Sequence, residues 1–200
     1  FKDADKIVFC FEFLNTLEKK EIKSGIGELI KYGLIGDKTI LDFLLEKNLK
    51  KLTANNLKHL IKKAIPIKEY FVKKDYFDTG IRNALNFGHS IGHGVEMLSE
   101  ENISHGEAVC LGMLAELKLS EIKLNLDKDL SSKVKTILSQ YEINEKTKVK
   151  DIDELISLIY KDKKNDDFLR FTLLENIEKP VSKMKISKEE LVSAIKEILE

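Results

Sequence analysis

Residues 75–93 read DYFDTGIRNALNFGHSIGH. Within this stretch the polar residues Arg82, Asn86, His89 and His93 recur at steps of four or three, which places them on one face of a predicted helix. A face of Arg, Asn and His is too polar for a core and carries little charge for an ordinary surface. We interpret it as the wall of a pocket for an anion and hydroxyl groups. An exposed polar helix face is the alternative interpretation.

His89 and His93 are four residues apart, so one helix could offer both imidazoles to a metal ion. The pair alone is weak evidence for metal, because Ser90 stands where the glutamate of an HExxH zinc motif would be. His105 lies at the expected start of the next helix, within reach across a short loop. The remaining histidine, His59, lies in a lysine-rich amphipathic segment and is expected to be exposed.

A catalytic zinc site with an open position also needs a carboxylate, and Glu28 is a candidate. It lies in residues 25–33 (GIGELIKYG), at an apolar, glycine-flanked helix start, and Lys31 shares its face one turn later. The alternative is a solvated glutamate in a first helical turn, which the helix dipole favours.

Glycines gather beside the histidines, namely Gly88, Gly92, Gly94 and Gly106. Because glycine weakens a helix, their presence indicates close approach of the backbone to a ligand or to another helix.

Composition excludes several classes of protein. The 200 residues carry 34 Lys+Arg and 34 Asp+Glu, so a nucleic-acid binder driven by bulk charge is not expected. With 42% apolar residues the chain is expected to be soluble and globular. The longest apolar stretch, residues 108–115, is too short for a membrane span. We find no signal peptide, and the isolated Cys10 and Cys110 indicate free thiols in a reducing compartment. We therefore expect a cytoplasmic protein with no membrane partner.

The periodicity predicts a mainly α protein. Asp37 can cap one helix, and Ser187 with Glu190 forms a capping box before an amphipathic helix that reaches Leu199. Residues 6–11 read as a strand, and residues 168–174 with 181–186 as a small β-hairpin near the C-terminus.

Three stretches resemble the strongest motifs of the 3-dehydroquinate synthase family: residues 25–33, residues 75–93 and residues 105–113 (HGEAVCLGM). They occur in the family's order, and residues 162–164 (DKK) resemble a fourth motif. The resemblance implies the helical C-terminal, metal- and substrate-binding domain of the dehydroquinate synthase-like fold. It also implies a lyase that uses NAD+ and Zn2+ (or Co2+). That enzyme converts 3-deoxy-D-arabino-heptulosonate 7-phosphate to 3-dehydroquinate and phosphate in the shikimate pathway, which leads to chorismate and the aromatic amino acids.

The resemblance also implies roles for individual residues. Glu28, His89 and His105 fall on the family's metal ligands, and His93 falls on a histidine that faces the substrate and helps to move protons. The catalytic and substrate-binding positions are Lys31, Lys68, Arg82 and Asn86, joined by one of Lys163 and Lys164. Two positions depart from the usual pattern: Ser90 replaces threonine, and Asp78 replaces glutamate.

Nothing in the chain resembles the family's N-terminal Rossmann-like domain, which carries most of the NAD+ site. The chain also begins with Phe1 rather than Met. We therefore interpret residues 1–15 as a remnant of that domain and residues 16–200 as the metal- and substrate-binding domain. The expected partners are a sugar-phosphate substrate, the missing N-terminal domain and, for the full-length enzyme, a second copy in a homodimer. The chain alone is expected to be inactive.

Other functions remain open. A related sugar-phosphate cyclase, such as 2-deoxy-scyllo-inosose synthase or an enzyme acting on sedoheptulose 7-phosphate, would share the chemistry but not the substrate carboxylate. Arg82 and the downstream DKK favour dehydroquinate synthase. A metal-dependent alcohol dehydrogenase would lack the anion-binding lysines. A non-enzymatic helical interaction module would use the histidines structurally.

Overall fold

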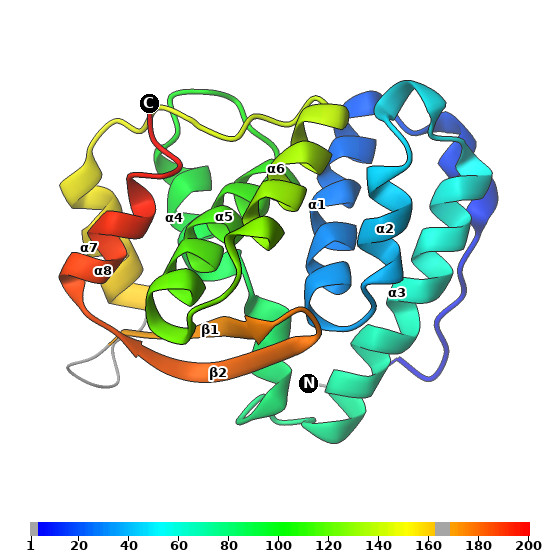
Figure 1. Cartoon of the computed structure of the whole chain (residues 1–200). Coiled ribbons are helices and arrows are strands. Elements are labelled where there is room, and N and C mark those ends of the chain that lie inside the picture. Colours follow the sequence, from blue (N-terminus) through cyan, green and yellow to red (C-terminus); the bar gives the residue numbers. More distant parts are fainter. Residues whose placement is uncertain (1–3, 163–168) are drawn as a thin grey trace.

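The computed structural model describes residues 4–162 and 169–200, without the side chains of residues 161 and 162. The helices are α1 (Lys19–Ile35), α2 (Thr39–Leu45), α3 (Ala54–Lys74), α4 (His89–Leu98), α5 (His105–Leu124), α6 (Lys128–Gln140), α7 (Ile152–Asp162) and α8 (Lys188–Ile195). Short 3-10 helices are η1 (Phe11–Thr16), η2 (Leu49–Lys51) and η3 (Ile81–Asn86). Strands β1 (Leu169–Asn176) and β2 (Lys179–Ile186) form a hairpin below α5 in Figure 1. The predicted mainly α fold with a hairpin near the C-terminus is confirmed. Predicted Lys163 and Lys164 lie outside the described residues.

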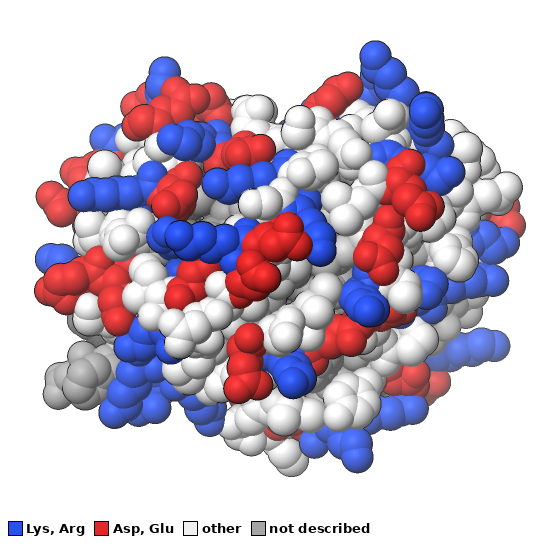
Figure 2. Space-filling view, viewed as in Figure 1, with Lys and Arg blue, Asp and Glu red and all other residues white. Residues whose placement is uncertain are grey.

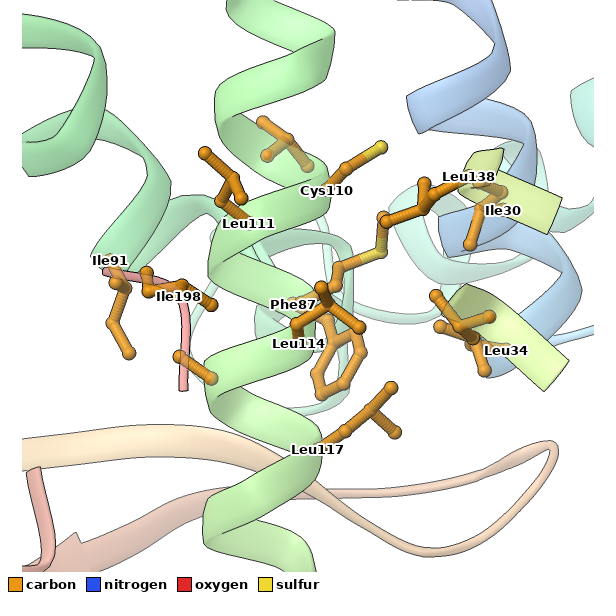
Figure 3. Close-up of a cluster of buried hydrophobic side chains, with 14 of the residues drawn as sticks. Ile30, Leu34, Phe87, Ile91, Cys110, Leu111, Leu114, Leu117, Leu138 and Ile198 are labelled. Atoms are coloured by element: carbon orange, nitrogen blue, oxygen red, sulfur yellow. The ribbon is translucent and has the colours of Figure 1, made fainter. Parts of the chain in front are cut away.

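Helix α5 is the central element of the fold. Its apolar side chains point in every direction, as expected for a helix buried on all sides. It contacts α1, α4, α6, α8 and β1. In Figure 3 its side chains Cys110, Leu111 and Leu114 lie within a buried cluster that includes Ile30 of α1 and Ile91 of α4. In the described part of the chain, no helix is both long and apolar enough to cross a membrane.

Two glycine contacts let α5 approach its neighbours closely. A Cβ on Gly112 would clash with the backbone carbonyl of Gly88, and a Cβ on Gly106 would clash with the carbonyl of Ser24 in α1. The close backbone approach predicted beside the histidines is therefore an approach to other helices. It brings the first turns of α4 and α5 next to α1.

The predicted single helical face running from Arg82 to His93 is wrong, because the chain turns between η3 and α4. Gly88 lies in this turn with a φ of +82°, a left-handed conformation that suits glycine. Its N–H donates to the buried carboxylate of Glu116 in α5, at 2.7 Å from Oε2. Arg82 and Asn86 therefore lie on a different element from the histidines.

The C-terminal elements follow the predicted pattern. β1 and β2 pair antiparallel, with Leu169 opposite Ile186, and β1 packs on α5. The predicted first hairpin residue, Phe168, lies outside the described residues. Ser187 and Glu190 form the predicted capping box of α8. The helix ends before Leu199, although that side chain is buried.

The start of the chain differs from the prediction. Residues 6–11 do not form a strand: residues 7–10 are irregular, and Phe11 begins η1. A strand needs a neighbouring strand to satisfy its backbone groups, and the sheet found among the described residues contains only β1 and β2. The N-cap residue of α2 is Lys38, one residue after the predicted Asp37. Asp37 nevertheless accepts the N–H of Thr39, the first residue of α2, at 3.0 Å from its Oδ1.

Candidate metal and substrate site

Glu28 and Lys31 form an ion pair on α1. The Lys31 ammonium donates to Glu28 Oε2 at 2.8 Å, although the whole lysine is only 4% exposed. Burial lowers the pKa of Lys31, and the Glu28 carboxylate opposes that effect without cancelling it. Burial would raise the pKa of Glu28, but His89, when its ring is protonated, and the Lys31 ammonium outweigh that effect and lower the pKa to about 2. The carboxylate is therefore ionised at neutral pH.

His89 is the first residue of α4, and its two ring nitrogens have different surroundings. Nδ1 lies 3.2 Å from the Phe87 carbonyl oxygen, which can only accept a hydrogen bond. The neutral ring therefore carries its proton on Nδ1, and Nε2 presents a lone pair. Nε2 lies 3.4 Å from Glu28 Oε1, an oxygen that is buried and has no hydrogen bond among the described residues.

His105 is the first residue of α5 and brings the third side chain to the same place. The Ser104–Glu107 capping box fixes the start of this helix, and the close contact of Gly106 with α1 holds it near Glu28. One potential ligand atom from each of Glu28, His89 and His105 lies within 4.8 Å of the others. The fold thus brings together the three predicted metal ligands, which lie on three different helices.

The donor set fits a divalent metal ion. Zinc binds imidazole nitrogen and carboxylate oxygen at about 2.1 Å, so two ligands of a tetrahedral site lie about 3.4 Å apart. This equals the separation between His89 Nε2 and Glu28 Oε1. Two facing acceptors gain nothing from each other unless a proton or a cation lies between them. Two histidines and one carboxylate would also leave one coordination position for a substrate.

His93 lies beside this donor set but is not part of it. Its ring is one turn after His89 on α4, with ring centroids 5.5 Å apart, and lies 5.6 Å from the ring of His105. The residue is exposed. His93 is therefore positioned next to the predicted metal ligands His89 and His105 and is exposed.

Lys68 approaches the ion pair from α3. Its charge contributes to lowering the pKa of Lys31, so the two ammonium groups share an environment. Lys68 and Glu28 both line a cavity of about 820 Å³ between α1, α3 and the N-terminal segment. Most of its other lining residues are apolar, including Tyr32, Ile7 and Phe9. Lys68 and the carboxylate of the donor set thus line the same cavity.

Arg82 and Asn86 lie on η3, which contacts α1, α3 and β2. The Arg82 guanidinium donates to the Tyr76 carbonyl oxygen at 2.8 Å, and its backbone N–H donates to Asp75 Oδ2 at 3.1 Å. Asn86 is exposed at the end of η3, three residues before His89. No described contact joins either side chain to Glu28, His89 or His105, so their substrate roles stay predictions. His59 is exposed, as predicted, and lies against Phe43.

Sequence reasoning missed Glu96. Its Oε2 lies 2.8 Å from His105 Nδ1. The signal was available, because an acid seven residues after His89 falls on the same helical face two turns later.

Residues 25–165 match the family model for the C-terminal part of 3-dehydroquinate synthase. The chain belongs to the 3-dehydroquinate synthase family. A 3-dehydroquinate synthase from Clostridium tetani is 41% identical over 199 residues, which cover 98% of this chain and 53% of the relative. A 3-dehydroquinate synthase from Campylobacter jejuni subsp. doylei is 32% identical over 200 residues, covering 96% of this chain and 57% of the relative. The chain thus spans about half the length of these curated relatives.

Solved structures at lower identity have a similar fold. A 2-deoxy-scyllo-inosose synthase complexed with carbaglucose-6-phosphate, NAD+ and Co2+ is 22% identical, with a TM-score of 0.81 over 94% of this chain and 55% of that chain. The ValA 2-epi-5-epi-valiolone synthase of Streptomyces hygroscopicus, with NAD+ and Zn2+ bound, is 21% identical, with a TM-score of 0.80 over 92% of this chain and 53% of that chain. The more similar relatives are named 3-dehydroquinate synthase, so the 2-deoxy-scyllo-inosose synthase alternative is not favoured.

Proposed function

We propose that this chain is the metal- and substrate-binding part of a longer 3-dehydroquinate synthase. The reaction would convert 3-deoxy-D-arabino-heptulosonate 7-phosphate to 3-dehydroquinate and phosphate. The observation that carries the proposal is the meeting of Glu28, His89 and His105 beside the buried Lys31 ammonium. The names of the relatives supply the product, 3-dehydroquinate, and the motifs' resemblance to that family supplies the substrate.

Glu28, His89 and His105 would hold Zn2+ or Co2+. When bound, this ion would polarise substrate hydroxyl oxygens at its open position. NAD+ would accept and return a hydride, and we propose that it binds mainly to the part of the longer protein outside this chain. A homodimer of the longer protein and a cytoplasmic location also stay predictions.

The side chains of this chain would bind the charged substrate. Lys31, Lys68 and Arg82 carry positive charge for the carboxylate and phosphate groups, and Asn86 offers an amide for hydroxyl groups. Lys31 is buried beside Glu28, so an anion that approaches it meets a cation with little competition from water. Phosphate gathers negative charge as it departs, and fixed cations favour that change.

His93 would move protons between the substrate and its surroundings. The ring is exposed and borders both histidine ligands, so it can reach a hydroxyl held at the metal and still exchange protons with water. An imidazole is the side chain best suited to that task near neutral pH.

On the face seen in Figure 2, basic and acidic side chains alternate and form no continuous basic surface. Even charge of this kind fits a small anionic substrate held in a local pocket rather than a polyanion bound along a surface. This supports an enzyme of small molecules over a nucleic-acid binder.

Substrate binding to the zinc-loaded 200-residue chain tests the proposal. Calorimetry should show that 3-deoxy-D-arabino-heptulosonate 7-phosphate binds about tenfold more tightly than sedoheptulose 7-phosphate, which lacks the carboxylate. The preference should shrink in Lys31→Met. Equal affinity for the two sugars would contradict the assigned substrate. With NAD+ added, the chain alone should release no phosphate from this substrate. Robust turnover would contradict the proposal that the NAD+ site lies mainly in the part of the longer protein outside this chain.

A further inference from the structure

Glu96 and His105 form a direct side-chain contact between α4 and α5. Glu96 Oε2 lies 2.8 Å from His105 Nδ1, a short distance for a nitrogen–oxygen hydrogen bond. Glu96 lies outside the three-residue donor set, and its contact with Nδ1 leaves Nε2 of the ring for a metal ion. We propose that Glu96 is a positioning residue that accepts the Nδ1–H of His105 and directs Nε2 to the metal ion. This assignment rests on the metal centre of the proposed function.

The two histidine ligands then share one arrangement. In His89 the acceptor for Nδ1–H is the backbone carbonyl of Phe87, and in His105 it is the Glu96 carboxylate. Both rings keep Nε2 for the metal. Helix α4 therefore provides one ligand, His89, from its first residue. Two turns later on the same helix, Glu96 orients the other ligand, His105.

His105 depends on this contact more than His89 does. The side chain of His89 is 17% exposed and is held by its own backbone turn, whereas that of His105 is 44% exposed. Packing alone leaves an exposed ring free to rotate. A neutral imidazole in water also favours the proton on Nε2, which would block that nitrogen as a ligand. A carboxylate on Nδ1 reverses the preference, fixes the ring and makes the ligand more basic.

The contact is expected to affect metal binding rather than fold stability. The side chain of Glu96 is 37% exposed, and exposed ion pairs contribute little to stability. A change at Glu96 should therefore leave the folded structure in place while altering the state of the ring. An unchanged fold with an altered proton position on His105 would distinguish a positioning role of Glu96 from a purely structural role.

The tautomer of His105 in the metal-free 200-residue chain is the first measurement. Two-dimensional proton–nitrogen NMR at about pH 8.5, where ordinary imidazoles are neutral, distinguishes the two nitrogens. We expect the proton of His105 on Nδ1 in the wild type and in Glu96→Gln, whose amide oxygen still accepts. We expect it to move to Nε2 in Glu96→Ala. A wild-type His105 with its proton on Nε2 would overturn the proposal without any variant.

Zinc affinity is the second measurement, by competition with a chromophoric chelator. Loss of such an outer acceptor typically costs 10–100-fold in affinity, and we expect about this loss in Glu96→Ala and a smaller one in Glu96→Gln. Glu154→Ala, which removes an exposed acid on α7, is the matched control and should bind as the wild type does. If the wild type binds zinc and Glu96→Ala binds equally well, only the role of Glu96 is overturned. If the wild type binds no zinc, the metal centre fails and this proposal fails with it.

Discussion

Glu28 Oε1 and His89 Nε2 face each other at 3.4 Å, each as a hydrogen-bond acceptor when the ring is neutral. Such a contact costs free energy unless a positive charge lies between or beside the two atoms. Lys31 occupies the other carboxylate oxygen, so Oε1 remains for a further cation. The arrangement fits a site built for a metal ion.

Removal of the Glu28 carboxylate should destabilise the metal-free chain. Glu28→Ala leaves the Lys31 ammonium buried without its partner, at an expected cost of about 1–3 kcal/mol in the free energy of unfolding. Lys31→Met in the same chain removes the stranded charge, so the double variant should recover part of the loss. Urea denaturation in EDTA measures both values. A double variant less stable than Glu28→Ala would contradict the role given to the ion pair.

Acid should destabilise the metal-free chain partly through Glu28. Its pKa falls from 4.5 to about 2 on folding, because His89 and Lys31 outweigh the effect of burial. A lowered pKa stabilises the fold fully above about pH 4.5, and this stabilisation is lost as the pH falls toward about 2. Glu28→Gln does not titrate, so its unfolding free energy should fall less over this range. Equal pH dependence of the two proteins in urea denaturation would show that Glu28 is not perturbed.

The glycine contacts predict substitutions with opposite effects. Gly112→Ala would force a methyl group against the Gly88 carbonyl and should cost about 3 kcal/mol or more, with loss of metal affinity because α4 carries His89. Gly25→Ala meets nothing within 4 Å on α1 and should stabilise the chain by up to about 1 kcal/mol. Thermal unfolding compares them. Similar melting temperatures for both variants would rule out a tight crossing of α4 and α5.

The sequence was sufficient to predict that Glu28, His89 and His105 come together, because they lie in motifs whose residue types and order are specific. It was also sufficient for the hairpin and for the capping box at Ser187, since local patterns determine both. The hairpin and the capping box depend on residues close in the sequence, and the meeting of the three side chains was predicted from motifs.

Long-range packing decides the features that the sequence did not reveal. The turn at Gly88 depends on Glu116, 28 residues away, which accepts its N–H. Periodicity counts residues along one helix and cannot detect that interruption. Residues 6–11 have strand-like composition but no strand beside them among the described residues. The contact of Glu96 with His105 exists only because α4 and α5 meet, so the role proposed for Glu96 could not be predicted from either helix alone.

Metal content tests the central claim most directly. The 200-residue chain, incubated with Zn2+ and freed of excess metal, should retain one ion per chain by elemental analysis. His89→Ala and His105→Ala should each lose it, whereas His59→Ala, which removes the exposed histidine of α3, should keep it. A wild type with no bound zinc, or zinc that stays bound after His89 is replaced, would contradict a metal centre at Glu28, His89 and His105.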